Sequence, residues 1–236
     1  LRKMASVDIS SLRLKYKSGH EVFLETDLKV KEPFAIFREW FNEALSSPDI
    51  PEPNGACIAT VDRDGRPSNR FVLLKDFTDQ GFTFFTNYNS RKATDIESNP
   101  NVAMTLYWVP LRKSIRIEGV AEKIPKEESE AYFRSRPRES QIGALVSNQS
   151  QKIPGRSHLE QIRQEIVSKI GESDPVPMPD WGGYLVKPYS IEFWQGQSDR
   201  IHDRIRFRKG DGVEQEIDGS LTFEGENGWV YERLAP

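Results

Sequence analysis

The chain has 236 residues, and its 33 lysines and arginines against 36 aspartates and glutamates give a net charge of −3. This length suits one domain with a sizeable core. An acidic chain lacks the broad basic field of nucleic-acid binders, so local clusters of cations favour a small anionic ligand. No apolar run reaches the roughly 18 residues of a membrane span. The single cysteine, Cys57, offers neither an internal disulfide nor metal-ligand spacing, and we expect a cytoplasmic protein without a metal or a membrane segment.

The N-terminal part divides into an arm and a helix. Residues 1–30 are polar and weakly patterned, which predicts an arm, and we expect a single domain over 31–236. At 31–45 the apolar residues recur at helical spacing, which predicts one amphipathic helix that buries Phe34, Phe37, Trp40, Phe41 and Leu45.

Short segments rich in β-branched and aromatic residues follow, and turn clusters separate them. This cadence predicts an antiparallel sheet or barrel, and so a mainly β protein with flanking helices of the α+β class. The predicted strands are 56–62, 70–77, 81–88, 102–109, 114–124, 182–196, 199–208 and 221–236, and helical patterns interrupt them at 90–100, 126–136 and 157–172. The glycines and acids of 208–228 suggest a surface hairpin.

The segment "DRIHDRIRFR", residues 199–208, concentrates cations. Read as a strand, it places five of them on one face: Arg200, His202, Arg204, Arg206 and Arg208. If this face is solvated, the repulsion is small and the charges form an outer edge that discourages strand pairing. If it lines a pocket, it needs an anion. These ten residues leave both interpretations open.

Cations also lie near two predicted helix starts. Ser90 is placed to cap a helix whose first turn carries Arg91 and Lys92, an outline of a phosphate site or simply a capped surface helix. Further on, arginines surround Pro137, and Ser140 is placed to cap a short helix.

Two cations in "RFVLLK" bear on how many anions the protein binds. Arg70 and Lys75 are an odd number of residues apart, so on a regular strand they face opposite sides. They would then serve two different anions. The sequence has no glycine-rich dinucleotide fingerprint, no phosphate loop and no His-Glu-x-x-His, which argues against Rossmann binding and zinc catalysis.

The motifs "RFVLLK", "FFTNYNSRK", "IRIEG", "YFRSRPRESQIGALVSNQS", "WGGY", "IEFWQGQSDRIHDR" and "YERLAP" occur in one order from about residue 33 to the end. Together they resemble the pyridoxine (pyridoxamine) 5′-phosphate oxidase family. The resemblance implies an FMN-binding split β-barrel of antiparallel Greek-key type and a homodimer with flavin at the subunit interface. It also implies oxidation of pyridoxine or pyridoxamine 5′-phosphate to pyridoxal 5′-phosphate with oxygen, which yields hydrogen peroxide and, from the amine, ammonia.

Carried over motif by motif, the resemblance implies these FMN contacts: Arg70, Phe71, Val72, Leu73, Phe85, Thr86, Arg91, Lys92, Gln149, Ser150, Trp194 and Arg204. The substrate phosphate would fall to Lys75, Tyr132, Arg136 and Ser140, with the catalytic candidates Arg200 and His202 against the substrate ring. In the arm, Arg13 and Tyr16 belong to a segment that resembles one able to fold over the substrate.

One position departs from the family pattern. Ser114 stands where many members have glutamine, which puts one flavin hydrogen bond in doubt unless water bridges the gap. Two alternative functions stay open: a split-barrel flavoprotein such as a flavin reductase, and a carrier that binds pyridoxal 5′-phosphate without turnover.

Overall fold

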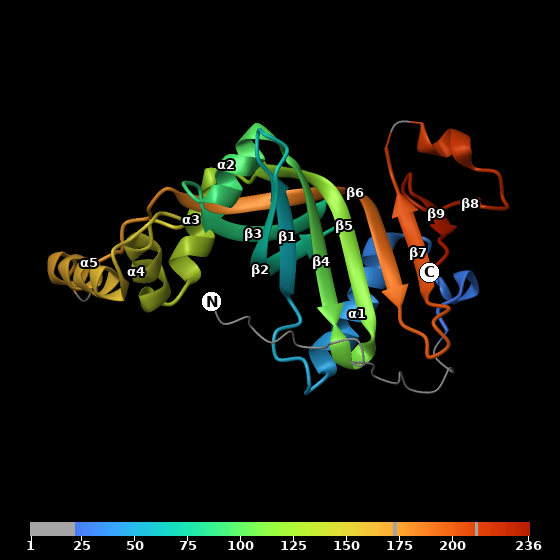
Figure 1. The fold of residues 1–236 in the computed structure, drawn as a ribbon, viewed down its shortest axis with the longest axis horizontal. Helices are drawn as coiled ribbons and strands as arrows, with labels where there is room; N and C mark the ends of the chain where they lie inside the picture. Colours follow the sequence, from blue (N-terminus) through green and yellow to red (C-terminus); the bar gives the residue numbers. More distant parts are fainter. Residues whose placement is uncertain (1–21, 172–173, 211) are drawn as a thin grey trace, which may run out of the picture.

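The computed structural model describes residues 22–171, 174–210 and 212–236 (Figure 1). Two of the predicted substrate contacts, Arg13 and Tyr16, lie outside the described residues. The described end of the predicted arm includes a short 3₁₀ helix, Glu25–Asp27.

Six antiparallel strands close into a barrel. In sheet order they run β3-β2-β1-β4-β5-β6, and β3 also pairs with β6, which closes the ring. Their bounds are β1 Gly55–Val61, β2 Pro67–Thr78, β3 Gly81–Asn87, β4 Asn101–Trp108, β5 Lys113–Lys123 and β6 Trp181–Gln195. The prediction of a mainly β, antiparallel split barrel is confirmed.

Alternation along the strands separates the barrel interior from its outer face. In β4 the residues Val102, Met104, Leu106 and Trp108 are buried, while the residues between them are half-buried or exposed. In β2 the side chain of Phe71 is 78% exposed beside half-buried Arg70 and Val72, because the pleat turns alternate residues to opposite sides.

Three further strands extend the sheet beyond β6, in the order β7-β9-β8. They are β7 Asp203–Arg208, β8 Thr222–Glu224 and β9 Val230–Arg233. The predicted strand over 199–208 is therefore too long, because residues 199–202 belong to a loop in which Arg200 has a φ of +68°. The predicted hairpin over 208–228 is also corrected: residues 209–210 and 212–221 form no strand and include a 3₁₀ turn, and β8 forms the hairpin with β9.

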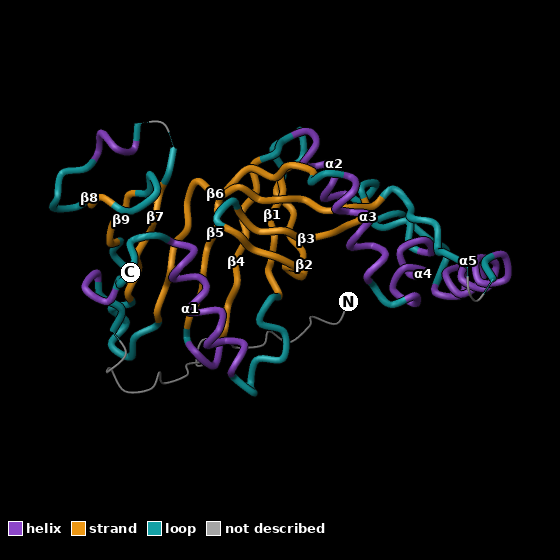
Figure 2. The backbone as a smooth tube through the Cα atoms, turned by 180° about the vertical axis from the view of Figure 1, so that it is seen from behind, coloured by secondary structure: helices purple, strands orange, loops and turns teal. Residues whose placement is uncertain are grey.

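Helix α1, Pro33–Ser46, lies against the barrel (Figure 2). The Glu32 side chain accepts hydrogen bonds from the backbone N–H groups of Phe34 and Ala35, which satisfies two free donors at the helix start. Phe37 packs edge to face on Phe77 and Phe82, with 4.8 Å between ring centroids in each pair. Leu45, which we predicted to be buried, is 63% exposed, because the apolar face ends at Ala44.

The remaining helices cover one end of the barrel and project from it. They are α2 Arg91–Ser98, α3 Lys126–Ser135, α4 Arg138–Val146 and α5 Arg156–Lys169. Both views show α4 and α5 at the end of the molecule opposite β7, β8 and β9 (Figures 1 and 2). The barrel thus separates two regions that carry predicted site residues.

Candidate functional site

A first cavity of about 490 Å³ lies between β2, β3 and the start of α2. Nine of the twelve predicted flavin contacts line it, together with Ser68 and Asn69: Arg70, Phe71, Val72, Phe85, Thr86, Arg91, Lys92, Gln149 and Ser150. The tenth, Leu73, lines the neighbouring cavity described below. Strand β2 supplies a run of backbone to this cavity, and α2 supplies its N-terminus with two cations.

Lys92 is a cation buried in the wall of the first cavity. Its Nζ atom donates to Thr86 Oγ1 at 2.8 Å, to Gln149 Oε1 at 2.6 Å and to Ser90 Oγ at 3.2 Å, all neutral oxygens. Burial, and then the neighbouring guanidinium of Arg70, lowers the pKa of Lys92 to about 8. Because none of these three acceptors carries a negative charge, an anion that enters the cavity would stabilise the ammonium form of Lys92.

Ser90 stands at the N-cap position of α2, as predicted, but its side chain makes no capping hydrogen bond. Its Oγ accepts from Lys92 instead. The backbone N–H of Arg91, at the helix start, donates to Ser150 Oγ at 3.2 Å. The helix therefore begins against the 149–150 segment, which brings four predicted flavin contacts together.

Arg70 points inward from β2, toward the barrel end that α2 covers. Its Nη1 donates to Thr60 Oγ1 at 2.6 Å, and Thr60 in turn donates to Asp95 Oδ2 at 2.6 Å. The Arg70 and Asp95 side chains approach to 3.9 Å. Burial lowers the pKa of Arg70, and Asp95 opposes that change. This arrangement fixes the guanidinium beside Lys92.

A second cavity, of about 450 Å³, adjoins the first and shares Phe85, Thr86 and Gln149 with it. All four residues predicted to bind the substrate phosphate line this second cavity: Lys75, Tyr132, Arg136 and Ser140. Lys75 lines the second cavity and Arg70 the first. The odd spacing alone does not account for this, because Phe71 also lines the first cavity and β2 has a register shift between Leu74 and Asp76. Ser140 does not cap α4, because that helix begins at Arg138 and Ser140 lies within its first turn.

Arg136 lacks a complete set of partners among the described residues. Its Nη1 atom is buried without a hydrogen-bond acceptor there. The guanidinium lies over the ring of Trp181, 4.8 Å from its centroid. Burial lowers the pKa of Arg136. A buried donor without an acceptor is costly, so this group is suited to an incoming anion.

Aromatic rings form the wall between the two cavities and the base of the second. Phe85 stacks on Tyr132 with 4.0 Å between centroids and on Trp181 with 5.2 Å. Trp181 had no predicted role, although the motif "WGGY" contains it. Thr60 and Asp95 also support a predicted contact, Arg70, and no quoted motif marks them for that role.

The other two predicted flavin contacts, Trp194 and Arg204, line a separate cavity of about 410 Å³ with Ser114. The Arg204 side chain donates to Glu192 at 2.8 and 3.1 Å and to the carbonyl of Ala235 at 2.7 Å. Trp181 and Trp194 are the first and fourteenth residues of β6, so these contacts and the first two cavities lie at opposite ends of one strand.

The loop over 196–202 carries Arg200 and His202 beside this third cavity. The His202 ring lies 4.9 Å from the Trp194 ring. Its Nδ1 atom accepts a hydrogen bond from the backbone N–H of Gln197 at 2.9 Å, which requires that Nδ1 carry no proton. Within one chain, Arg200 and His202 therefore do not reach the cavity of the predicted phosphate contacts.

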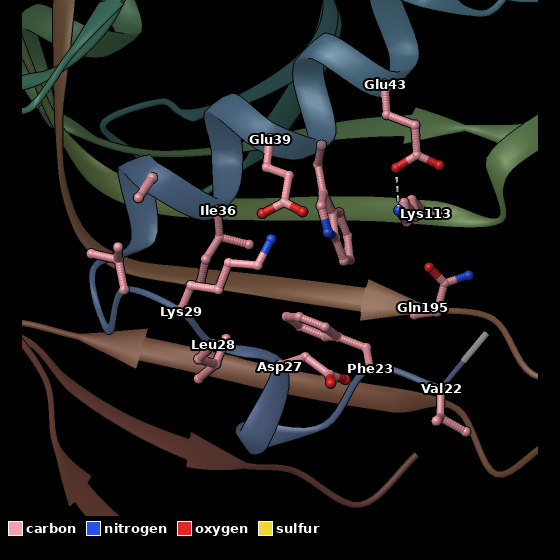
Figure 3. Close-up of a pocket in the computed structure, with 13 residues that line it drawn as sticks. Val22, Phe23, Asp27, Leu28, Lys29, Ile36, Glu39, Glu43, Lys113 and Gln195 are labelled. Atoms are coloured by element: carbon pink, nitrogen blue, oxygen red, sulfur yellow. Dashed lines mark hydrogen bonds and ion pairs between the residues drawn. The ribbon is translucent and has the colours of Figure 1, made fainter.

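One further cavity, of about 480 Å³, lies between residues 22–30, α1 and the ends of β5 and β6 (Figure 3). None of the predicted site residues lines it. Within the described ranges no three His, Cys, Asp or Glu side chains are placed to hold a metal ion. No helix of that part is long and apolar enough to cross a membrane.

Comparison with known proteins places the chain in a family. A family model described as "Pyridoxamine 5'-phosphate oxidase" matches residues 43–168, and one described as "Pyridoxine 5'-phosphate oxidase C-terminal dimerisation region" matches residues 181–236. The chain is similar to the pyridoxine-5′-phosphate oxidase of Bos taurus, at 48% identity over 98% of this chain and 89% of that protein. It is also similar to the pyridoxine/pyridoxamine 5′-phosphate oxidase of Bombyx mori, at 50% identity over 98% of this chain and 90% of that protein.

Among solved structures, PhzG from Burkholderia lata in complex with tetrahydrophenazine-1-carboxylic acid resembles this fold with a TM-score of 0.77. The identity is 26%, and the match covers 93% of this chain and all of that one. The sequence relatives match nearly the whole chain at 48% and 50% identity, and the barrel agrees with the solved structure. The chain belongs to the pyridoxine/pyridoxamine 5′-phosphate oxidase family.

Proposed function

We propose that the protein oxidises pyridoxine 5′-phosphate or pyridoxamine 5′-phosphate to pyridoxal 5′-phosphate, with FMN as cofactor and oxygen as electron acceptor. The observation that carries this proposal is the pair of adjoining cavities, each with a cation suited to an anion. The first has the buried ammonium of Lys92, and the second has half-buried Arg136, whose Nη1 atom is buried without an acceptor among the described residues. Two phosphate-bearing ligands side by side would satisfy both groups.

The residues of the first cavity fit the phosphate of FMN. Lys92 and Arg91 supply charge, Ser150 supplies a hydroxyl, and the N-terminus of α2 contributes the positive end of its dipole. Arg70, Phe71 and Val72 would lie along the rest of the cofactor. When bound, FMN would supply the hydride acceptor and then pass the electrons to oxygen, which gives hydrogen peroxide.

The residues of the second cavity would hold the substrate. Lys75 and Arg136 supply charge, and the hydroxyls of Tyr132 and Ser140 are placed in the same cavity. Tyr132 also stacks on Phe85, which lines both cavities, so substrate and cofactor would contact the same ring. Arg200 and His202 would orient the substrate ring.

A homodimer would complete the site. Arg200, His202, Trp194 and Arg204 lie at the other end of β6 from both phosphate cavities, so a second copy must supply them. The family model for residues 181–236 is described as a dimerisation region, which supports this assembly. The site would then draw its phosphate cavities from one chain and its ring-orienting loop from the partner.

The test is anaerobic addition of pyridoxine 5′-phosphate to the purified, FMN-loaded protein. We expect the visible flavin absorption to bleach. Readmission of oxygen should restore it and release pyridoxal 5′-phosphate and hydrogen peroxide in equal amounts. A carrier without turnover would bind the ligand and leave the flavin spectrum oxidised, which would refute the proposed function.

A matched substrate pair tests the second cavity against other split-barrel activities. Pyridoxine lacks the phosphate, so it should bleach the flavin at least about a hundredfold less efficiently in kcat/KM, since contacts with a charged group contribute about 1.5 to 3 kcal/mol each. Arg136→Ala should remove most of that preference. Equal efficiency for both compounds would point to a different substrate class.

A further inference from the structure

Asp203, the first residue of β7, is a buried carboxylate with three hydrogen-bond donors. Its Oδ2 accepts from the backbone N–H of Phe23 at 3.0 Å and from Gln197 Nε2 at 2.7 Å. Its Oδ1 accepts from Arg233 Nη1 at 2.8 Å. The residue is 7% exposed. A carboxylate at this depth is stable only while such partners are in place.

The Gln197 contact leads from Asp203 into the loop over 196–202. The backbone N–H of Gln197 donates to His202 Nδ1, and its carbonyl accepts from the backbone N–H of Arg200 at 3.4 Å. Arg200 adopts a left-handed backbone conformation, with φ at +68°, that is uncommon for a residue with a side chain. One glutamine therefore touches both predicted ring-orienting residues, and Asp203 holds its side chain.

Apolar packing contributes little to this loop. Ile201, its apolar residue, is 67% exposed, and Arg200 is exposed as well. The loop has no buried apolar side chain of its own to set its conformation, so its polar anchors must do so. The hydrogen bond from Gln197 Nε2 to Asp203 anchors the loop to the first residue of β7.

The remaining contacts of Asp203 extend to two other parts of the chain. Arg233, on β9, pairs with Glu25 and donates to the carbonyl of Phe23 at 2.7 Å. Figure 3 shows Phe23 below α1, with Gln195 at the nearby end of β6. One carboxylate thus joins the segment over 22–25, the loop over 196–202 and strand β9.

We propose that Asp203 is a positioning residue, which acts through Gln197 to hold Arg200 and His202 where they orient the substrate ring. This rests on the proposed function of those two residues. A carboxylate is needed because both of its oxygens accept here, whereas the amide of an asparagine has a single acceptor oxygen and would turn N–H groups toward one of the donors.

The first experiment compares Asp203→Asn with Glu232→Gln in the FMN-loaded protein. Glu232, on β9, accepts from Arg206 and Arg208 and does not touch the loop, so its variant also removes a carboxylate paired with arginine from the same sheet. We expect Asp203→Asn to lower kcat/KM for pyridoxine 5′-phosphate at least about tenfold at saturating FMN, with an unchanged FMN dissociation constant. Glu232→Gln should retain the wild-type value. Equal kinetics in the two variants would overturn the proposal.

A second variant, Gln197→Ala, removes the link while it leaves the Asp203–Arg233 ion pair in place, so it carries the test if Asp203→Asn does not fold. It should lose kcat/KM like Asp203→Asn. In a His202→Ala, Arg200→Ala background, neither change should cost more, because a positioning residue acts through the residues it positions. Losses that multiply with that background would overturn the proposal.

A measurement without turnover separates this inference from the proposed function. In protein labelled with ¹⁵N-histidine, the wild-type His202 signals should show an unprotonated Nδ1, and both Asp203→Asn and Gln197→Ala should raise the Nδ1-protonated population. If wild-type protein does not oxidise the substrate, the proposed function fails, and this tautomer shift alone decides whether Asp203 positions the loop. No shift in either variant would overturn the inference even in an active enzyme.

Discussion

Lys92 is a residue whose ionisation should govern cofactor affinity. Its pKa of about 8 in the unliganded protein lies below its ordinary value of 10.5, because burial and Arg70 disfavour the ammonium form. A phosphate dianion favours that form. We therefore expect FMN affinity to fall above pH of about 8, by up to about tenfold per pH unit. Titration of FMN fluorescence across this range would measure the slope, and Lys92→Met should bind more weakly and without that slope.

The ionisation of Lys92 should also change the unfolding free energy of the FMN-free protein. Between the folded pKa of about 8 and the unfolded value of 10.5, the unfolded chain holds the proton that the folded chain has lost, so stability rises with pH in this window. Urea unfolding of the FMN-free protein at several pH values would show the rise. An identical pH dependence in Lys92→Met would contradict the role of Lys92.

Arg200, His202 and Arg204 are close in sequence, but we expect different kinetic defects from them. Arg200→Ala and His202→Ala should lower kcat/KM by about a hundredfold and leave FMN affinity nearly unchanged, because they misplace the reacting carbon. Arg204→Ala should weaken FMN binding first. It also removes one of the two arginines that pair with the buried carboxylate of Glu192, which keeps Arg116. Steady-state assays at saturating FMN with separate FMN titrations distinguish the two patterns; an unaffected Arg200→Ala enzyme would contradict the proposed substrate contact.

At the scale of elements, β7 shows why the cations are aligned. Arg204, Arg206 and Arg208 share a face, and carboxylates on the neighbouring strands form ion pairs with them. Glu192 on β6 pairs with Arg204, and Glu232 on β9 pairs with Arg206 and Arg208. Arg208 also pairs with Glu216. The repulsion between the arginines of β7 is thus offset by carboxylates within the sheet, and Arg206 and Arg208 need no bound anion to neutralise their charges.

This pairing makes a prediction about Arg206 and Arg208. Each single change to alanine should cost about 0.5 to 1 kcal/mol of unfolding free energy, because Glu232 keeps its other arginine. The double change should cost more than the sum, since Glu232 then loses both partners. Turnover should stay near the wild-type value in all three. Additive losses in urea unfolding, or a catalytic defect in either single variant, would refute this account.

The elements that sequence alone predicted well are those set by local pattern. Strands such as β4 alternate apolar and polar residues, and α1 repeats its aromatic residues at helical spacing, so both followed from short-range rules. The start of β7 did not, because the left-handed backbone at Arg200 ends the alternation and no local signal marks a non-glycine residue for that conformation. The predicted burial of Leu45 was wrong for a similar reason, since helical spacing does not show where the surface that the helix packs against ends.

At the scale of the whole molecule, cofactor binding and dimerisation should be linked. If FMN binds only the assembled site, it stabilises the homodimer by mass action, by about 2.7 kcal/mol at a hundred times its dissociation constant. Sedimentation velocity at low protein concentration, with and without FMN, should show monomers that FMN converts to dimers. A stable monomer that binds FMN as tightly as the dimer would contradict a shared site.

The candidate site was predictable from sequence only as far as the family motifs reached. They grouped Lys75, Tyr132, Arg136 and Ser140, which line one cavity although they come from β2, α3, α4 and the turn between these helices. They did not reveal that Trp194 and Arg204 lie in a different cavity of the same chain, because that separation depends on the path of β6. The closure of β3 on β6 is likewise a long-range pairing without a local signature.

The length of β6 has a consequence for stoichiometry. Fifteen extended residues span up to about 45 Å, so a small ligand cannot touch both ends of one strand. Each dimer would then contain two composite sites, and every site would combine the Trp181 end of one copy with the Trp194 end of the other. Mixing an Arg136→Ala chain with an Arg200→Ala chain would place both lesions in one site of each mixed dimer and leave the second site intact. Two proteins of low activity, unfolded and refolded together in equal amounts, should therefore regain about a quarter of the wild-type activity by subunit complementation.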